Sequence, residues 1–293
     1  VDQLKNKPFD KKSHHQMARK AAEQSIVLLK NEHDILPLKK SSKVALIGDF
    51  AKTPRYQGAG SSVVNPTKLD STLDIIEHYP LELAGFAAGY PRTGPSDAAL
   101  EQEAIALAKQ ADVVLLYIGL DEISESEGLD RAHMKLPDSQ ISLLHKLSKA
   151  NPHIIAVLSA GSAIEMPWLD ECEAVIHGYL SGQAGASAML NAITGKVNPS
   201  GKLSETYPLV YEDSPSAPYF PAKERNVEYR EGLYVGYRYF ETVKKPVRFP
   251  FGYGLSYTTF AYSNLSVDDH KAVFTIQNTG TRDGAEVAQL YVS

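Results

Sequence analysis

The chain has 293 residues and a mass of 32.1 kDa, and at about 150 residues per domain this length suggests two domains. It carries 30 Lys and Arg against 35 Asp and Glu, a net charge of −5 that argues against nucleic acid as a partner. Cys172 is the single cysteine, which excludes an internal disulfide and a cysteine-based zinc site but leaves the cellular compartment undecided.

Residues 1–42 are predicted to form an amphipathic helix and a turn. Apolar side chains recur at helical spacing from Met17 to Leu29, and the polar residues 31–34 are expected to end the helix. Val1 is not an initiator methionine, so the chain is expected to begin at a cut. We expect this segment to be a linker helix that leads into the first domain.

Short apolar runs alternate with helical stretches between residues 43 and 206. The predicted strands are 43–48, 112–119, 153–159 and 173–178, and the predicted helices are 98–110, 137–150 and 184–193. The strands are nearly continuous runs of Val, Ile and Leu, which is typical of strands buried on both faces. Their alternation with helices predicts an α/β fold over residues 43–208, a mostly parallel sheet flanked by helices in a flavodoxin-like α/β sandwich.

The composition changes after residue 208. Residues 207–262 hold ten of the sixteen tyrosines and many prolines, which predicts an ordered connection over 209–257 that packs through aromatic contacts. Alternating residues then predict three strands, at 261–267, 271–277 and 286–292. These strands indicate the start of an antiparallel β-sandwich over 258–293, which the chain is expected to leave incomplete.

The loop after residue 48 is the first candidate site, because ligands of an open parallel sheet gather at the carboxyl ends of its strands. It contains Gly58, Gly60, Ser61 and Ser62, whose hydroxyls and exposed amides could cradle a phosphate. The third glycine of a dinucleotide fingerprint is missing, and so is a Gly-Lys-Ser/Thr string. The pattern therefore favours a tight surface loop, with the phosphate cradle as the weaker alternative.

The loop after residue 119 is strongly acidic, with five carboxylates in residues 121–130. The spacing of a calcium-binding loop is absent. Gly128 directly after Glu127 would let the loop carry that carboxylate into a cleft, and an ion pair between Asp130 and Arg131 is expected to brace it. The loop is thus either a solvated acidic surface or the carrier of a functional carboxylate.

No Gly-x-Ser-x-Gly string is present, so a serine hydrolase would lack its nucleophile.

Several strings together resemble glycoside hydrolase family 3, and in that family's order they cover nearly the whole chain. Residues 21–31 and 36–38 are similar to the segment that leaves the family's (β/α)8 barrel. The strings that resemble its second domain are Gly58-Ala-Gly-Ser-Ser62, Glu125-Ser-Glu-Gly-Leu-Asp-Arg131, Pro167-Trp-Leu169, and residues 198–204 and 249–257. Residues from Thr258 onward resemble the start of the family's fibronectin type III-like domain.

The resemblance implies a retaining β-glucosidase or a relative of one. In the family, the glutamate of the Glu-Gly-x-Asp-Arg string is the general acid/base, which here is Glu127, with Asp130 and Arg131 beside it as supporting residues. The loop of glycines and serines lies near the sugar in the family, which makes Ser61 and Ser62 candidate substrate contacts. The family's nucleophile is an aspartate on the barrel, usually followed by tryptophan. No such pair occurs here, so the chain alone is expected to be inactive.

The expected substrate is a β-glucoside or an oligosaccharide with a terminal β-linked sugar, and the expected protein partner is the barrel of the same full-length protein. No cofactor, metal ion or nucleic acid is expected. A membrane span is not expected either, because the longest apolar stretch, residues 113–120, is far below the roughly 20 residues required. Two interpretations compete with the enzyme. One is a non-catalytic carbohydrate-binding or scaffolding module, and the other is a flavodoxin-like nucleotide-binding protein that rests on fold analogy alone.

Two further expectations concern the arrangement of the chain in space. We expect residues 58–62 and 125–131 to lie at the same edge of the sheet, since both loops follow the carboxyl ends of parallel strands. We also expect Tyr234, Tyr237, Phe249 and Phe251 to be mostly buried between the sandwich and the β-domain, because aromatic side chains bury large areas.

Overall fold

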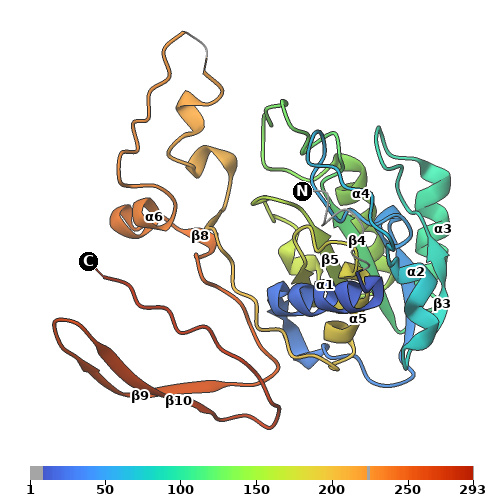
Figure 1. Ribbon diagram of the computed structural model, residues 1–293. Coiled ribbons are helices and arrows are strands. Elements are labelled where there is room, and N and C mark those ends of the chain that lie inside the picture. The colour runs from blue at the N-terminus through green and yellow to red at the C-terminus, as the bar shows by residue number, and fades with distance from the viewer. Residues whose placement is uncertain (1–8, 223–224, 293) are drawn as a thin grey trace.

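The computed structural model of the protein describes residues 9–222 and 225–292, so the first eight residues of the predicted linker segment and Ser293 lie outside the described residues. The elements, in chain order, are α1 (Lys11–Ser25), β1 (Val27–Asn31), β2 (Lys43–Ile47), α2 (Thr72–Ile75), β3 (Glu82–Ala87), α3 (Ala98–Ala108), β4 (Val113–Gly119), α4 (Asp138–Ala150), β5 (Ile154–Ser159), β6 (Ala174–His177), α5 (Gly185–Ile193), β7 (Tyr207–Pro208), α6 (Tyr237–Val243), β8 (Val247–Phe249), β9 (Phe260–Val267) and β10 (Ala272–Asn278). Figure 1 shows the α/β layers gathered on one side, with the chain after residue 208 extending away from them.

The central sheet has six strands in the order β1-β6-β5-β4-β2-β3. Strands β2 to β6 run parallel to one another, and β1 pairs with β6 in the antiparallel direction. The five parallel strands alone have the spatial order second, first, third, fourth, fifth, which is the flavodoxin-like order. The predicted fold class is confirmed. The chain direction across the sheet reverses between β2 and β4, so a ligand crevice is expected where these two strands end.

Each face of the sheet is covered by a layer of helices. Side chains of α3 and α4 pack on one face, against alternate residues of β2, β4 and β5. Side chains of α1 and α5 pack on the other face, against the intervening residues of the same strands. All seven residues of β4 are buried as a result. This double cover is the reason the central strands read as unbroken apolar runs.

The first helix is shorter than the sequence pattern predicts. It ends at Ser25, the backbone of Ile26 is extended, and residues 27–31 form β1 at the edge of the sheet. Val27 and Leu28 are both fully buried, whereas a continued helix would have turned one of them away from the apolar face. A strand buries both because successive side chains point to opposite faces, each of which is covered by helices. The sheet therefore begins within the predicted linker, ahead of residue 43.

Strand β3 was not among the predicted elements. It forms the other edge of the sheet and pairs only with β2 among the described strands. Its first residues, Glu82 and Leu83, are exposed, and Gly85 interrupts its middle. Strand β3 is only partly covered, with Ala87 in the core on one face and Phe86 half-buried against the core on the other, so it lacks the continuous apolar run by which the central strands can be found in the sequence.

The connection after β6 and α5 packs through aromatic side chains only in part. Phe249 on β8 is 6% exposed and contacts the rings of Tyr207 and Tyr253. Tyr237 and Phe251 are half-buried, with ring centroids 5.0 Å apart. Tyr234 is 55% exposed, so the prediction that it is buried is wrong. It lies in the lobe before α6 that Figure 1 shows extending away from the sheet, where no described core residue covers it.

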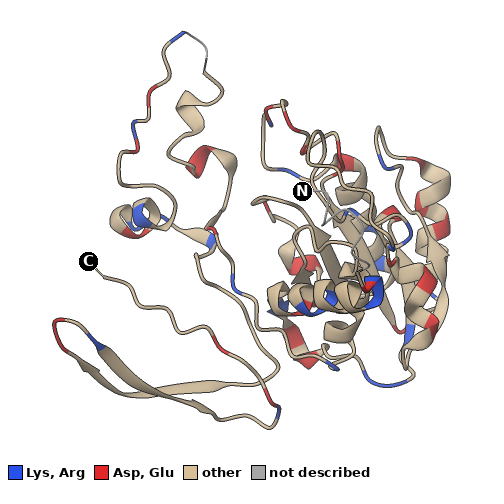
Figure 2. Ribbon diagram, viewed as in Figure 1, with Lys and Arg blue, Asp and Glu red and all other residues tan. Residues whose placement is uncertain are grey.

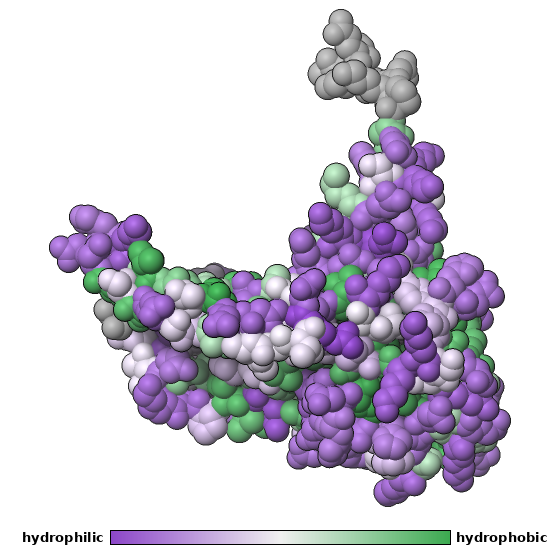
Figure 3. Space-filling model, turned by 90° about the horizontal axis from the view of Figure 1, so that it is seen from below, coloured by the Kyte–Doolittle hydropathy of each residue, from purple (hydrophilic) through white to green (hydrophobic). Residues whose placement is uncertain are grey.

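The C-terminal part contains a two-stranded hairpin, β9 and β10, in place of the three predicted strands. Residues 286–292 have no strand pairing within the described residues. Glu286 pairs instead with Lys202, ahead of β7, at 2.9 Å, and Gln289 donates to the carbonyl of Gly252 in the connection. The hairpin is exposed on both faces, and Figure 3 shows hydrophobic surface on that arm of the molecule.

No helix in residues 9–222 and 225–292 combines the length and the apolar character that crossing a bilayer requires.

Candidate active site

The loops that follow β2 and β4 meet at the switch point of the sheet. Ala59 and Ser126 form an isolated parallel bridge, and the amide of Glu127 donates to the carbonyl of Ala59 at 3.4 Å. The expectation that residues 58–62 and 125–131 share one edge of the sheet is confirmed. Figure 2 shows acidic residues along the loop after β4, at the upper rim of the α/β layers.

Glu127 is an exposed carboxylate held by a single neighbouring residue. Its Oε2 accepts hydrogen bonds from the amide of Ser61, at 2.8 Å, and from the Ser61 hydroxyl. Gly60 makes this approach possible, since a Cβ at that position would lie 2.7 Å from the Cβ of Glu127. Its φ of +91° is also a conformation that other residues avoid. The glycine before Ser61 is therefore required by the contact between the two loops.

These two hydrogen bonds set the charge of Glu127. The donors of the Ser61 side chain and backbone stabilise the ionised carboxylate and hold the pKa of Glu127 below its usual range. Within the described residues Glu127 has no ion-pair partner. In this chain it is a solvated carboxylate, ionised at neutral pH and able to accept a proton.

Asp121 and Glu122 fix the start of the acidic loop. Oδ1 of Asp121 accepts from the amides of Ile123 and Ser124, at 3.0 and 2.7 Å. Glu122 forms a bidentate pair with Arg92, with N–O distances of 2.6 and 3.0 Å. Burial would raise the pKa of Glu122, but the bonds from Arg92 outweigh it and the pKa is lowered.

Arg92 also joins the loops of three neighbouring strands. Its Nη1 lies 2.5 Å from Asp49, directly after β2, and donates to the carbonyl of Thr53 at 3.0 Å. Its guanidinium lies 4.8 Å from the ring centroid of Phe50. Because Arg92 itself follows β3 and pairs with Glu122 after β4, it holds the start of the acidic loop against the rest of the sheet edge.

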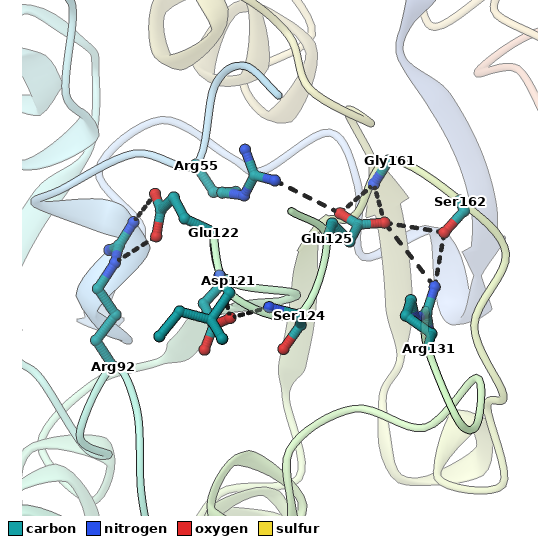
Figure 4. Close-up of polar contacts among 10 residues, drawn as sticks. Arg55, Arg92, Asp121, Glu122, Ser124, Glu125, Arg131, Gly161 and Ser162 are labelled. Carbon is teal, nitrogen blue, oxygen red and sulfur yellow. Dashed lines mark hydrogen bonds and ion pairs between the residues drawn. The ribbon is translucent and has the colours of Figure 1, made fainter. Parts of the chain in front are cut away.

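Glu125 is the most firmly held carboxylate of the loop (Figure 4). The amide of Gly161 donates to both of its oxygens, at 3.0 and 2.8 Å, and the Ser162 hydroxyl donates to Oε1 at 2.9 Å. Two guanidinium groups lie on either side, with Arg55 3.8 Å from Oε2 and Arg131 3.9 Å from Oε1. The acidic loop is thereby fastened to the loop after β5 and to the loop after β2.

The expected bracing of Glu127 by an Asp130–Arg131 ion pair is wrong. Arg131 pairs with Glu125 and donates to the Ser162 hydroxyl at 2.7 Å. Asp130 is exposed and has no hydrogen-bond or ion-pair partner among the described residues. Arg131 is half-buried, and its reach toward the loop after β5 leaves Asp130 in solvent.

Ser61 and Ser62 differ in where they lie relative to Glu127. Ser61 contacts the carboxylate directly, as given above. The Ser62 hydroxyl turns back over Gly58, where an added Cβ would lie 2.7 Å from it. Both serines are exposed at the rim, so their candidate role as substrate contacts stays a prediction.

Arg55, Arg92, Gly161 and Ser162 were not singled out from the sequence. They come from the loops after β2, β3 and β5, and only the fold brings them to the acidic loop. Arg92 follows β3, an edge strand that the sequence pattern does not reveal. Within the described residues no three His, Cys, Asp or Glu side chains are placed to hold a metal ion.

Comparison with known protein families shows which family this chain belongs to. Residues 26–257 match the family model described as the glycosyl hydrolase family 3 C-terminal domain. The chain belongs to glycosyl hydrolase family 3. The matched range begins at β1 and includes both loops of the switch point, so the family match covers the whole site described above.

The relatives of this family 3 chain are longer proteins. It is 44% identical, over 98% of its length, to thermostable beta-glucosidase B of Acetivibrio thermocellus. It is equally 44% identical to the exo-alpha-(1->6)-L-arabinopyranosidase of Bifidobacterium breve, over 99% of its length. The crystal structure of a family 3 beta-glucosidase from Bifidobacterium adolescentis superposes with a TM-score of 0.91 at 43% identity, over 94% of this chain and 42% of that one. The chain spans 40% of the length of each of these two curated relatives.

Proposed function

We propose that this chain supplies the general acid/base of a retaining β-glycosidase that removes terminal, non-reducing β-linked sugars, with Glu127 as the catalytic residue. The observation that carries the proposal is the placement of Glu127. It is exposed at the switch point of the sheet, held from the neighbouring loop by Ser61, and free of a cationic partner within the described residues. Asp121, Glu122 and Glu125 are engaged by arginines or by backbone amides, and Asp130, although exposed, makes no hydrogen bond or ion pair with the loop after β2 among the described residues.

A retaining glycosidase needs two carboxyl groups about 5–5.5 Å apart. One attacks the anomeric carbon and forms a covalent glycosyl-enzyme, while the other protonates the leaving oxygen. The second group then removes a proton from water, which displaces the enzyme carboxylate from the anomeric carbon. In the proposal Glu127 performs both proton transfers, and the nucleophile is an aspartate on a (β/α)8 barrel outside this chain.

The proton-donor role requires a higher pKa than Glu127 has in this chain. A nucleophile carboxylate close by would raise the pKa of Glu127, because two like charges disfavour each other's ionisation. Exclusion of water by a bound sugar acts in the same direction. The Ser61 hydrogen bonds oppose both effects and favour the ionised form, which is the form needed in the second step. Ser61 would thus help Glu127 as a base, and Ser61 and Ser62 would contact the sugar.

The first experiment replaces Glu127 by Gln in the full-length protein that contains this chain. General acid–base catalysis contributes roughly 10²–10⁴-fold, so hydrolysis of a glycoside with a poor leaving group should fall by about that factor. An activated aryl-glycoside needs little protonation, so its first step should be spared and the second should become limiting. Azide should then restore turnover, because it attacks the glycosyl-enzyme without a base and yields the glycosyl azide.

Two controls make this experiment decisive. Glu122→Gln alters a carboxylate of the same loop that is paired with Arg92 and exchanges no proton with substrate, so any leaving-group dependence or azide rescue should be far smaller than in Glu127→Gln. The isolated 293-residue chain should hydrolyse nothing. Turnover by the pure chain, or equal losses in the Glu127 and Glu122 variants, would contradict the proposal.

The sugar is tested separately. Because the relatives include a named beta-glucosidase and a named arabinopyranosidase, the full-length protein should be assayed with aryl β-glucosides and aryl α-L-arabinopyranosides side by side. Hydrolysis of the β-glucoside is the expected result. Sugar binding without any hydrolysis would instead support a non-catalytic carbohydrate-binding module.

A further inference from the structure

We propose that Glu125 is the positioning residue of Glu127: its carboxylate closes the base of the short loop on which Glu127 stands and fixes that loop to the sheet. The inference rests on the proposed function of Glu127. It concerns a residue that the comparisons do not assign.

The geometry of the loop base is the first argument. Glu125 and Arg131 meet across 3.9 Å, and both contact the hydroxyl of Ser162. The five residues between them, 126–130, project into solvent, and Glu127 stands near the tip beside Gly128. Besides this base, the projecting segment is held by the bridge of Ser126 to Ala59 and by the contacts of Glu127 with Ala59 and Ser61. The direction in which Glu127 points therefore depends on the clamp at Glu125.

The negative charge of Glu125, as well as its hydrogen bonds, holds the base of the loop in place. The Arg55 side chain is only 1% exposed, and its Nε and Nη2 have no hydrogen-bond partner. Glu125 is its ion-pair partner, and neutralising one member of a buried pair removes the attraction that offsets the desolvation of the other. A Gln at position 125 could still accept from Gly161, but it would leave Arg55 without its ion-pair partner and turn an amide toward a guanidinium. The base of the loop would have to rearrange.

A positional effect on Glu127 has a kinetic signature that a folding defect does not share. If Glu127 is displaced, proton transfer slows, so substrates with poor leaving groups lose more than activated ones, and azide compensates in the second step. If instead a smaller fraction of the variant is folded, the rates of hydrolysis of all substrates fall by the same factor and azide restores no activity. The comparison of substrates thus separates the two causes.

The experiment uses Glu125→Gln in the full-length protein. We expect kcat on an alkyl glycoside to fall by about tenfold to a hundredfold, the size of effect that a displacement of about 1 Å produces. KM should change little, the loss on an activated aryl-glycoside should be smaller, and azide should recover part of it. Ser162→Ala removes one donor to Glu125 and leaves every charge in place, so it should show the same pattern with a smaller loss.

Glu101→Gln is the matched control. Glu101 on α3 is another buried glutamate, 5% exposed, which accepts from Ser142 at 2.8 Å and pairs with Lys146, away from the acidic loop. Its replacement should cost stability but produce no leaving-group dependence and no azide rescue.

The outcomes distinguish this inference from the proposed function. One outcome is that Glu127→Gln shows leaving-group dependence and azide rescue while Glu125→Gln and Ser162→Ala, like Glu101→Gln, show neither. In that case the positioning role of Glu125 is wrong, and the proposed function of Glu127 stands. If Glu127→Gln lacks its signature, the proposed function itself fails. Should Glu125→Gln not fold, Ser162→Ala alone decides between the two results.

Discussion

The residues of the acidic loop differ in their partners, and the partners decide which of them is free to exchange a proton. Glu122 and Glu125 face arginines, and Asp121 accepts from two backbone amides. Glu127 faces only Ser61, a neutral donor that can be displaced by a sugar hydroxyl or by water. The number of acidic residues in the loop therefore does not indicate which one is functional, whereas the partners of each carboxylate do.

At this scale the sequence could point to Glu127 but could not place it. Its assignment comes from the string Glu125 to Arg131 and the family that this string resembles. The contact with Ser61 joins residues 66 positions apart, and the clamp on Glu125 uses Gly161 and Ser162, 36 and 37 positions away. No local pattern encodes such contacts, because they depend on which strands become neighbours in the sheet.

The Ser61 contact predicts a pKa change that can be measured in the chain itself. Ser61→Ala removes the hydroxyl donor that stabilises the ionised carboxylate, so the pKa of Glu127 should rise toward that of an ordinary glutamate. The measurement is an NMR titration of the Glu127 side-chain carboxyl carbon. Ser62→Ala is the control, since the Ser62 hydroxyl turns toward Gly58, and it should leave the Glu127 pKa unchanged. An unchanged pKa in Ser61→Ala would show that the contact does not persist in solution.

At the scale of elements, burial decides which parts of the fold the sequence could reveal. Strands β2, β4, β5 and β6 are covered on both faces, and each was predicted to within a residue or so of its observed bounds. The two edge strands were not: β3 was missed and β1 was predicted as helix. The helical spacing of apolar residues that begins at residue 17 continues to residue 29, within β1, by coincidence. Pairing of β1 with β6 makes residues 27–31 a strand despite that spacing.

The observed burial in β1 and exposure on α1 predict very different losses of unfolding free energy for two substitutions. Leu28 is fully buried in the sheet, so Leu28→Ala should lower the free energy of unfolding by about 2–5 kcal/mol, as for other core leucines. Met17 is 68% exposed on α1, so Met17→Ala should change it by less than about 0.5 kcal/mol. Urea denaturation of the chain and both variants measures the difference. A loss at Leu28 as small as that at Met17 would contradict the burial of Leu28 in β1.

At the scale of the whole molecule, a buried histidine ties the sheet to the connection. His177 at the end of β6 is fully buried. A carbonyl oxygen can only accept, so the 3.2 Å contact of Nδ1 with the carbonyl of Leu158 on β5 assigns the ring proton to Nδ1, and in this tautomer the Tyr179 amide, 3.4 Å away, does not donate to that nitrogen. The Nε2 of His177 therefore accepts from the hydroxyl of Tyr207 on β7, at 3.0 Å. Burial lowers the pKa of His177 to about 4, so the ring is neutral in the folded protein at neutral pH.

This histidine predicts how the stability of the chain depends on pH. The folded pKa of about 4 lies below the value of roughly 6.5 for an unfolded histidine. Between these values the unfolded chain binds a proton that the folded chain does not, so stability falls as the pH drops through this window. The stability associated with His177 is fully present above about pH 6.5. Its loss amounts to about 3 kcal/mol once the pH reaches 4, at about 1.4 kcal/mol per pKa unit.

Urea denaturation at pH 7, 6 and 5 tests this dependence in a range where ordinary carboxylates are still ionised. His177→Asn, which keeps a donor for Leu158 but cannot titrate, should be less stable at pH 7 and should lose less on going to pH 5. His270 is exposed in the hairpin, and His270→Asn should leave the wild-type slope intact. If His177→Asn retains the full slope between pH 7 and 5, the dependence belongs to other groups. The buried contact of β6 with β5 and β7 would then contribute to stability without responding to pH.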